Sequence, residues 1–299
     1  MICSMCPRKC GVSRSERLGF CQASDALEVA SISIHQGEEP PIAGRKGVVN
    51  VFFAHCNLQC LFCQNYEISR GKVSEEKVFY HSVEEVVDRI AELLPETENM
   101  VGFVSPGHYA HWIGPIVEML HDRGLFPTTV YNTNGYDSVE SLRMVAPYID
   151  IYLPDLKYSR SDLALRYSHA ADYPEVSQEA LKEMFAQKGS GLPTDDDGLA
   201  FRGIIIRHLV LPGQVENSIE CLEWIAENLS TRIHISLMAQ YFPPQGVGVL
   251  PDELGRTLSE AEYDRVVEAF NQLGFTKGWV QELSASLNYI PDFSKKQSF

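Results

Sequence analysis

Apolar, strand-like runs alternate with amphipathic helical stretches along the chain from residue 47 onward. The strand-like runs are rich in Val, Ile, Tyr and Phe and cover residues 47–54, 99–106, 128–135, 149–157, 201–213 and 232–241. The helical stretches mostly begin near Ser, Asp or Asn and cover residues 82–94, 111–124, 137–148 and 219–229. Strands that alternate with helices form parallel sheets, so the pattern predicts an α/β fold, either an open doubly wound sheet or an incomplete β/α barrel. In either fold, chemistry collects at the carboxyl ends of the strands.

The pattern divides the chain into three regions. Residues 1–46 form an amino-terminal segment rich in cysteine, and residues 47–245 hold the six strand and helix units. Residues 246–299 form a carboxyl-terminal extension with a helix over 259–274 and a final strand within 278–284. We expect this extension to pack on the barrel.

The connection over residues 158–200 is unusually long for a link between two strands. It contains a predicted helix over 177–189, an acidic loop "GLPTDDDG" over 191–198, and the aromatic residues Tyr167 and Tyr173. Connections of this length are commonly functional lids, so we expect an inserted region that recognises the substrate.

Composition narrows the classes of partner. The formal net charge is −15 and the pI is about 5.0, which disfavours nucleic acid, since binding to phosphates relies on Lys and Arg. No apolar run approaches the roughly 18–20 residues of a membrane span. The opening "MICSMCPRKC" has no apolar segment typical of a signal peptide, so we expect a cytoplasmic protein without membrane contact.

Three cysteines lie close together in "HCNLQCLFCQN", at Cys56, Cys60 and Cys63. In a reducing compartment such a group favours metal ligation over disulfides. Four thiolates close a metal site, whereas three can hold an iron–sulfur cluster and leave one iron open to a small molecule. The alternative is a zinc site completed by His55 or a distant cysteine. Cys221, in a predicted amphipathic helix, is interpreted as a buried structural thiol.

The spacing C-x3-C-x2-C after the first predicted strand, with Phe62 before the last cysteine, resembles the cluster loop of the radical S-adenosylmethionine (radical SAM) superfamily. "CQNYEIS", "DLK" at 155–157 and "RHLVLPG" at 207–213 resemble pyruvate formate-lyase activating enzymes and their uncharacterised relatives. The resemblance implies a partial (β/α)6 TIM-like barrel with a [4Fe-4S] cluster. It also implies reductive cleavage of S-adenosylmethionine to a 5′-deoxyadenosyl radical that abstracts hydrogen from a substrate.

By this resemblance, four residues at strand ends line the cofactor pocket: Asn134, Asp155, Lys157 and Arg207. The superfamily usually places G-G-E at the tip of the second strand to bind the amino group of the cofactor, and this chain has "FVSPGHYAHW" there. Ser105 is therefore expected to take that contact, with Gly107 permitting close approach of the backbone. The "GEEP" at 37–40 is excluded because it precedes the cluster loop.

The same loop contains candidate residues for the substrate side of the pocket. His108 and Tyr109 follow Gly107 directly, and we expect both side chains to face the pocket and act on the substrate. They are the candidate catalytic residues of this chain.

The amino-terminal cysteines form a second pattern, C-x2-C-x3-C-x10-C, at Cys3, Cys6, Cys10 and Cys21. Four thiols with turn-forming Pro and Gly residues between them can surround one metal centre. The count predicts a closed site, and it fits a structural zinc or an auxiliary iron–sulfur cluster equally.

The preferred interpretation is that the chain is a radical SAM enzyme. One subclass of such enzymes activates a glycyl-radical enzyme, which would then be a large partner protein. The alternatives are radical modification of a small molecule or peptide, a non-catalytic iron–sulfur electron-transfer protein, and a zinc-dependent nucleic-acid module, which the acidic charge disfavours. The resemblance implies flavodoxin or ferredoxin as the electron donor.

Overall fold

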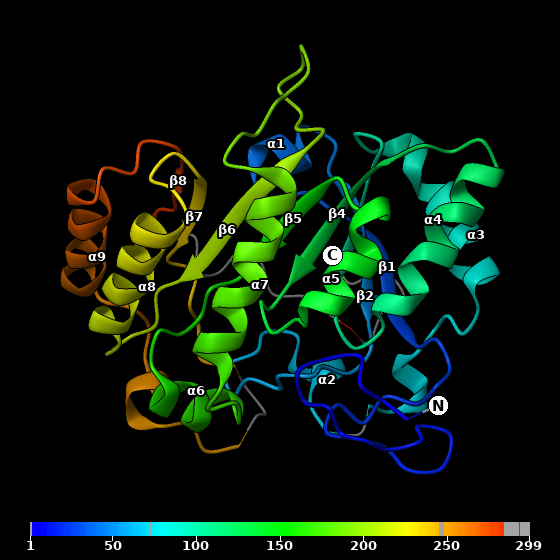
Figure 1. Cartoon of the computed structure of the whole chain (residues 1–299), viewed down its shortest axis with the longest axis horizontal. Coiled ribbons are helices and arrows are strands. Elements are labelled where there is room, and N and C mark those ends of the chain that lie inside the picture. Colours follow the sequence, from blue (N-terminus) through cyan, green and yellow to red (C-terminus); the bar gives the residue numbers. More distant parts are fainter. Residues whose placement is uncertain (1, 72, 245–247, 284–292, 294–299) are drawn as a thin grey trace.

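In the computed structural model, residues 2–71, 73–244, 248–283 and 293 are described. They form one eight-stranded sheet whose strands follow the order of the sequence (Figure 1). The strands are β1 (Val29–His35), β2 (Val48–Phe53), β3 (Met100–Val104), β4 (Thr128–Thr133), β5 (Ile151–Pro154), β6 (Gly203–Leu209), β7 (His234–Met238) and β8 (Gly278–Val280). All neighbours pair in parallel except β1 and β2. The prediction of a partial α/β barrel is confirmed.

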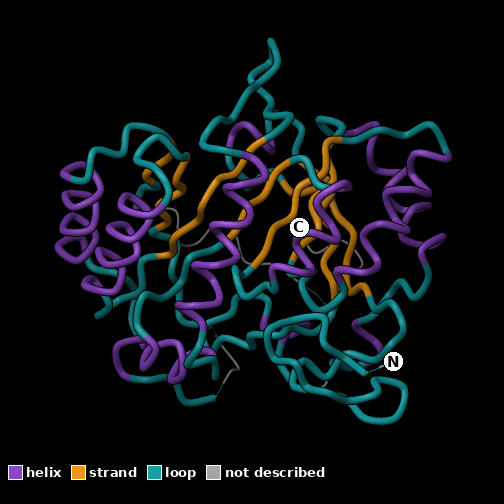
Figure 2. Tube along the Cα trace, in the orientation of Figure 1, coloured by secondary structure: helices purple, strands orange, loops and turns teal. Residues whose placement is uncertain are grey.

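Helices cover the outside of this sheet (Figure 2). The α-helices are α1 (Pro40–Ala43), α2 (Tyr66–Ser69), α3 (Val83–Leu93), α4 (Ile113–Asp122), α5 (Val139–Val145), α6 (Ser161–Ser168), α7 (Tyr173–Lys188), α8 (Val215–Asn228) and α9 (Glu260–Gln272). Short 3-10 turns are η1 (Glu75–Lys77), η2 (Leu94–Glu96), η3 (Ala110–Trp112), η4 (Ala146–Tyr148) and η5 (Asp252–Gly255). Several helices begin where the sequence predicts: the Ser82 and Ser138 side chains accept the N-terminal amides of α3 and α5.

Strand β1 is the main element that the sequence analysis missed. It pairs antiparallel with β2, so the chain turns back at residues 36–47 before it enters the first parallel strand. Its sequence "VASISIH" does carry partial apolar and polar alternation, which is typical of a strand. Its consequence is that residues 36–39 lie beside the start of β2, at the end of the barrel opposite the cysteine loop (Figure 1).

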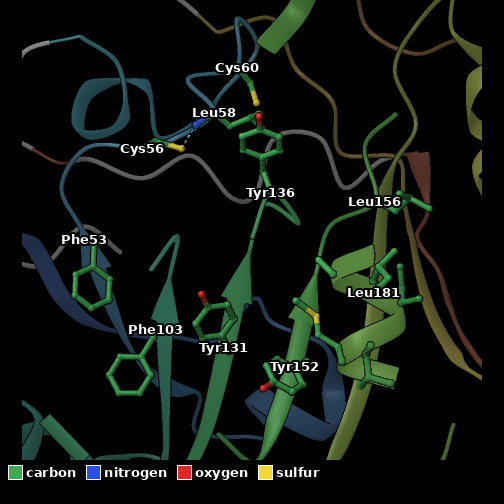
Figure 3. Packing of buried hydrophobic residues seen from close by; sticks show 14 of the residues in the cluster. Phe53, Cys56, Leu58, Cys60, Phe103, Tyr131, Tyr136, Tyr152, Leu156 and Leu181 are labelled. Carbon is green, nitrogen blue, oxygen red and sulfur yellow. Dashed lines mark hydrogen bonds between the residues drawn. The ribbon is translucent and has the colours of Figure 1, made fainter. Parts of the chain in front are cut away.

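The core lies between the sheet and its helices. Phe53, Phe103, Tyr131 and Tyr152 stand on successive strands, β2 to β5, and all are at most 1% exposed (Figure 3). Parallel strands covered on both faces are apolar along their length, and β2 and β3 are buried at every position. This packing aligns the strand ends that form the site.

The carboxyl-terminal part adds α9, which packs against α8, and the short strand β8 beside β7. The predicted strand over 278–284 begins as expected, while residue 284 lies outside the described residues. Phe293 is buried and its ring meets Phe52 edge-on, with ring centroids 5.6 Å apart. In the part of the chain that is described, no helix has the length and apolar character needed to cross a membrane.

Candidate functional site

A cavity of about 460 Å³ lies inside the partial barrel and extends from the cysteine loop to the segment after β1. It brings together most of the residues that the sequence analysis singled out: Cys56, Cys60, Cys63, Ser105, Asn134, Asp155, Lys157 and Arg207. These residues come from β2 to β6 or from the loops after those strands. The carboxyl ends of parallel strands meet at one edge, which explains why residues spread over 150 positions converge here.

The cysteine loop leaves β2 through backbone conformations that few side chains adopt. His55 and Gln59 have φ of +68° and +54°, in the left-handed region. The His55 amide donates to the carbonyl of Ile68 at 2.6 Å, which closes the loop onto α2. Cys56 and Cys60 are buried and Cys63 is partly buried, and Figure 3 shows Cys56 and Cys60 at the loop that follows β2.

Hydrogen-bond donors point at the loop's sulfurs. The Leu58 amide and Asn134 Nδ2 each lie 3.4 Å from Cys56 Sγ, and the Ser69 hydroxyl lies 3.2 Å from Cys63 Sγ. Burial raises the pKa of the Cys60 thiol to about 12, although the Lys157 ammonium acts in the opposite direction. Donors aimed at sulfur stabilise a thiolate, the form that ligates metal.

These features test whether the residues fit an iron–sulfur cluster. Three thiols on one loop line the cavity, and hydrogen-bond donors lie close to the sulfurs of Cys56 and Cys63. In the described residues, no group of three or more His, Cys, Asp or Glu side chains is arranged to hold a single metal ion. The loop fits a cluster that is held by three thiolates and open at its fourth iron.

Asp155 and Lys157 lie at the tip of β5 and form an ion pair. Lys157 Nζ is 2.5 Å from Asp155 Oδ2, and both side chains are mostly buried. Burial lowers the pKa of Lys157, but Asp155 and the neighbouring thiol of Cys60 outweigh it, so the pKa is raised. Lys157 therefore keeps its charge beside the cysteine loop and has N–H donors left for a ligand.

Arg207 is held by two carboxylates of the "GEEP" segment, which was excluded above only as the tip of the second strand. Its Nε and Nη2 donate to Glu39 at 2.8 and 2.6 Å, and Nη2 also pairs with Glu38. Glu38 Oε1 accepts from the side-chain amides of Asn50 at 2.8 Å and Asn132 at 3.4 Å. As expected, the "GEEP" segment is not the tip of the second parallel strand, but it lines the cavity, which the sequence did not predict.

The physical reason is the antiparallel turn between β1 and β2. It carries residues 37–40 to the amino-terminal end of β2, where Glu38 and Glu39 reach into the barrel and line the cavity. The two adjacent glutamates were a signal in the sequence, because carboxylates that become buried need a charged or hydrogen-bonding partner. Arg207 supplies that partner, so its charge is already balanced within the protein.

His108 and Tyr109 do not face the cavity, contrary to the prediction. Both are completely buried, and neither lines the cavity. His108 Nε2 lies 2.8 Å from the carbonyl of Ala54, and burial lowers the pKa of the ring to about 3. The turn after Pro106 directs both rings into the core, under the amino-terminal segment. Ser105, at φ +54°, does reach the cavity.

The segment over 158–200 contacts the site through its tyrosines and not as a lid. Tyr173 Oη accepts the Lys157 amide at 3.0 Å and donates to the carbonyls of Asn134 and Asp155 at 2.9 and 3.0 Å, behind the cavity. Tyr167 Oη donates to Glu253. The acidic loop over 191–198 precedes β6 and projects from the opposite end of the sheet (Figure 1). Substrate recognition by that loop at the cavity is therefore not supported.

The four amino-terminal cysteines lie close together beside the cysteine loop. Burial, opposed in part by a hydrogen bond from the Arg8 backbone, raises the pKa of the Cys6 thiol to about 12, and the charges of Cys21, Cys3 and Cys10 add to the rise. The Gln59 side chain donates to the carbonyl of Phe20 at 2.7 Å, which ties the two cysteine segments together.

Arg8 is the main link between these segments. It donates to the carbonyl of Asn57 at 2.9 Å and to those of Ser168 and His169 at 3.1 and 2.5 Å, and its guanidinium lies 3.8 Å from the centroid of the Phe20 ring. Arg8→Ala is expected to weaken the loop by about 2 kcal/mol, because three bonds from a charged donor are lost. Amide hydrogen exchange over 57–63 should become about 30-fold faster. Unchanged exchange, equal to that of the exposed-site control Arg17→Ala, would contradict this link.

Gly135 follows β4, and its backbone lies close to the backbone of Asp155 at the tip of the next strand. Its φ is +80°, and a Cβ there would lie 2.2 Å from the Asp155 carbonyl oxygen. Gly135→Ala should cost about 3 kcal/mol or more in free energy of unfolding, since both strain and a backbone clash arise. Gly124 has φ +75° and open space, so Gly124→Ala isolates the strain, about 1–2 kcal/mol. Equal losses in urea unfolding would show that the clash does not matter.

Comparison with known proteins agrees with this architecture. No protein-family model matches the chain. An uncharacterized protein of Methanocaldococcus jannaschii, MJ0674, is 26% identical over 270 residues, which cover 89% of this chain and 73% of that protein. A second uncharacterized protein of the same organism is 27% identical over 158 residues, 47% of this chain and 45% of that protein.

Among solved structures, the chain resembles SuiB of Streptococcus suis. The structure of SuiB bound to its precursor peptide SuiA gives a TM-score of 0.53 at 14% identity, with 78% of this chain and 48% of SuiB covered. The structure bound to S-adenosylmethionine gives 0.50 at 14% identity, with 79% and 50% covered. The chain therefore shares the partial-barrel fold of SuiB, and it spans about half the length of SuiB.

Proposed function

We propose that this chain is a radical SAM enzyme that holds a [4Fe-4S] cluster on Cys56, Cys60 and Cys63 and binds S-adenosylmethionine in the adjoining cavity. The observation that carries the proposal is the single cavity that joins three buried or half-buried thiols to polar side chains from five strand ends. A reduced cluster bound on this loop would supply one electron to S-adenosylmethionine, which would then be cleaved to methionine and a 5′-deoxyadenosyl radical. That radical would take a hydrogen atom from the substrate.

Different side chains of the cavity are suited to different groups of the cofactor. Lys157 lines the cavity and its charge acts on the Cys60 thiol, so it is suited to the carboxylate of S-adenosylmethionine, while Asp155 can accept from hydroxyl groups. Asn134 donates to Cys56 Sγ and steadies the loop, and Ser105 offers a hydroxyl at the tip of β3. Arg207, neutralised by Glu38 and Glu39, lines the cavity as part of a paired cluster.

A peptide or protein is the proposed substrate class. This choice is supported by the likeness in fold to SuiB, which has been solved bound to its precursor peptide SuiA. Activation of a glycyl-radical enzyme is one reaction of this kind on a protein, and modification of a small molecule is the alternative. Flavodoxin or ferredoxin is proposed as electron donor. Cys3, Cys6, Cys10 and Cys21 are proposed as ligands of a second centre, zinc or iron–sulfur, whose binding would draw together side chains that in this structure are not arranged to hold a single ion.

The test uses anaerobically purified, iron-reconstituted protein. The EPR spectrum of the reduced cluster is recorded with and without S-adenosylmethionine, and 5′-deoxyadenosine is assayed in the same sample. We expect a spectral change on cofactor addition together with 5′-deoxyadenosine formation. A cluster whose spectrum ignores the cofactor and yields no 5′-deoxyadenosine would favour the electron-transfer function instead.

A further inference from the structure

One wall of the cavity is formed by β7 and β8 together with the residues that follow them. Ser236, Met238 and Gln240 stand at alternate positions in and after β7, and Trp279 and Gln281 do so in and after β8. Ser236 pairs with Trp279 in the parallel register, and all five residues line the cavity. Successive side chains of a strand point to opposite faces of a sheet, so these five share its inner face.

Gln281 is held in this wall by four hydrogen bonds. Its amide donates to the carbonyl of Leu237 at 2.9 Å, and its carbonyl accepts from the Tyr263 hydroxyl at 2.7 Å. Its side-chain oxygen accepts from the Ala239 amide at 2.9 Å, and its side-chain nitrogen donates to Gln240 Oε1 at 2.8 Å. A backbone amide can only donate, so the Ala239 amide fixes which end of the Gln281 side chain is the oxygen.

This order of donors and acceptors also orients Gln240. Because Gln281 Nε2 carries only donors, the Gln240 atom that faces it is the oxygen, and the Gln240 amide nitrogen is turned away from Gln281. Among the described residues, Gln240 Nε2 has no hydrogen-bond partner, and it is not one of the polar atoms that are buried without one, so it keeps accessible surface. Gln240 lines the cavity, and its two N–H donors are therefore available to a ligand there.

The donors of Gln240 lie beside the cysteine loop and beside apolar surface. Gln64, which directly follows Cys63, donates from Nε2 to the backbone carbonyl of Gln240 at 3.3 Å. Trp279 lines the same wall, and its ring is stacked with that of His234, with ring centroids 6.1 Å apart. The wall therefore offers two oriented donors and an aromatic surface next to the loop that we propose to hold the cluster.

The charges of the cavity determine which kind of acceptor fits these donors. Among the described Asp, Glu, Lys and Arg side chains that line the cavity, three are carboxylates, Glu38, Glu39 and Asp155, and two are cations, Lys157 and Arg207. Both cations are already paired with these carboxylates. A second anion would meet a surplus of negative charge and lose its water, whereas a neutral carbonyl needs only the N–H donors.

We propose that Gln240 is a specificity-determining residue that donates to a backbone carbonyl of a peptide substrate, beside the ring of Trp279, and that Gln281 is the positioning residue that orients it. A peptide fits both features of the wall, because each of its residues carries a neutral, strongly accepting carbonyl next to a side chain. A carbonyl held there lies next to the cysteine loop, where the radical of the proposed function would form. The inference rests on the proposed function.

The test requires no knowledge of the particular peptide. The probe is a tryptic digest of protein from bacteria grown in fully deuterated medium, so that every carbon-bound hydrogen is deuterium. When the 5′-deoxyadenosyl radical breaks a C–D bond of a bound peptide, the deuterium atom joins C5′ and the unpaired electron stays on the peptide. Mass spectrometry of 5′-deoxyadenosine then reports the transfer from any peptide. The anaerobic, iron-reconstituted protein receives S-adenosylmethionine and dithionite, and a deuterated small-molecule extract of the same cells is the second probe.

We expect the wild type to take deuterium from the peptides. Gln240→Met keeps the length of the side chain and removes its donors, so the half-saturating peptide concentration should rise about 10-fold, which corresponds to one hydrogen bond. Retention of the peptides on ultrafiltration, with S-adenosylmethionine and without dithionite, measures binding without turnover and should fall in proportion. Gln281→Met should act severalfold alone and add little to Q240M. Gln272→Met, the same change at an exposed position of α9, is the matched control.

A contact of Gln240 with the cofactor is distinguished by the Kd of radiolabelled S-adenosylmethionine, measured by anaerobic equilibrium dialysis without reductant. A loss of cofactor affinity in Q240M as large as its loss of peptide affinity would overturn the proposal. Equal use of the peptides by wild type and Q240M would also overturn it, as would a wild type that forms 5′-deoxyadenosine but takes deuterium from the small-molecule extract alone or from neither probe.

A second variant covers the case in which Q240M does not load its cluster. Gln240→Glu still accepts from Gln281 and has no N–H group to offer, so unchanged half-saturation by the peptides in Q240E overturns the proposal. Wild-type protein that forms no 5′-deoxyadenosine would instead reject the proposed function.

Discussion

Replacing Cys60 by alanine is expected to abolish cofactor chemistry. Two thiolates cannot hold a cluster that needs three, so the loop's share of iron should be lost on reconstitution. Even partners outside the first ligand shell of a metal site are worth about 10–100-fold in affinity, so 5′-deoxyadenosine formation should fall by more than about 100-fold. Iron content, the EPR response to S-adenosylmethionine and 5′-deoxyadenosine are measured on one sample.

Cys221 provides the matched control. It is a completely buried thiol in α8 and does not line the cavity. Cys221→Ala should lower the free energy of unfolding by about 1 kcal/mol through lost packing and leave iron content and cleavage intact. If Cys60→Ala kept the EPR response, the loop would not be the site of the reactive cluster.

Replacing Arg207 by methionine is expected to give the largest loss of stability. Its side chain is 13% exposed and pairs with Glu38 and Glu39, whose side chains are each 6% exposed. Removing one partner of a buried ion pair costs about 3–5 kcal/mol, because the remaining charge has no partner and little water. Urea unfolding of the anaerobically purified protein measures the loss.

The sign of the pH dependence should reverse in this variant. In the wild type, burial raises the pKa of Glu38 but Arg207 and its other partners outweigh it, so the pKa is lowered. Ionised Glu38 therefore stabilises the wild type above its unfolded pKa, and that contribution is lost as the pH falls. In R207M burial dominates and raises the pKa, so stability should be greater at about pH 5 than at about pH 8.

A triple variant checks that the carboxylates are the cause. Adding Glu38→Gln and Glu39→Gln to R207M removes both unpaired charges and should restore part of the lost stability and flatten the pH profile. An R207M protein that is as stable as wild type, with the wild-type pH profile, would show that the three side chains are not coupled.

The position of the glutamates illustrates what the sequence could not reveal. The motif at 37–40 precedes the cysteine loop in the chain, and no local pattern shows that β1 turns back antiparallel to β2. That pairing places Glu38 against Asn50, Asn132 and Arg207, across separations of up to 169 residues. Contacts over such distances depend on the assembled barrel and leave no periodic signal in the segment itself.

The loop after β3 shows the same limit. Its sequence places His108 and Tyr109 next to a strand end, where side chains commonly face the site. The turn at Pro106 and the amino-terminal segment packed above it bury both rings instead, and Tyr109 reaches the cavity only through Glu28 and His55. The direction in which a side chain points from a short loop depends on the segments that cover the loop. Residue type and position in the sequence therefore did not reveal where these two rings point.

The sequence by itself determined the parallel strands, the cysteine loop and the residues at the strand tips, because hydrophobic periodicity is local and parallel strands end at one edge. Asn134, Asp155, Lys157 and Arg207 accordingly converge on one cavity. Only the tertiary structure decided which charges pair, which rings are buried and how Arg8 joins the two cysteine segments. These features depend on contacts between distant segments, and such contacts exist only once the chain has closed around its core.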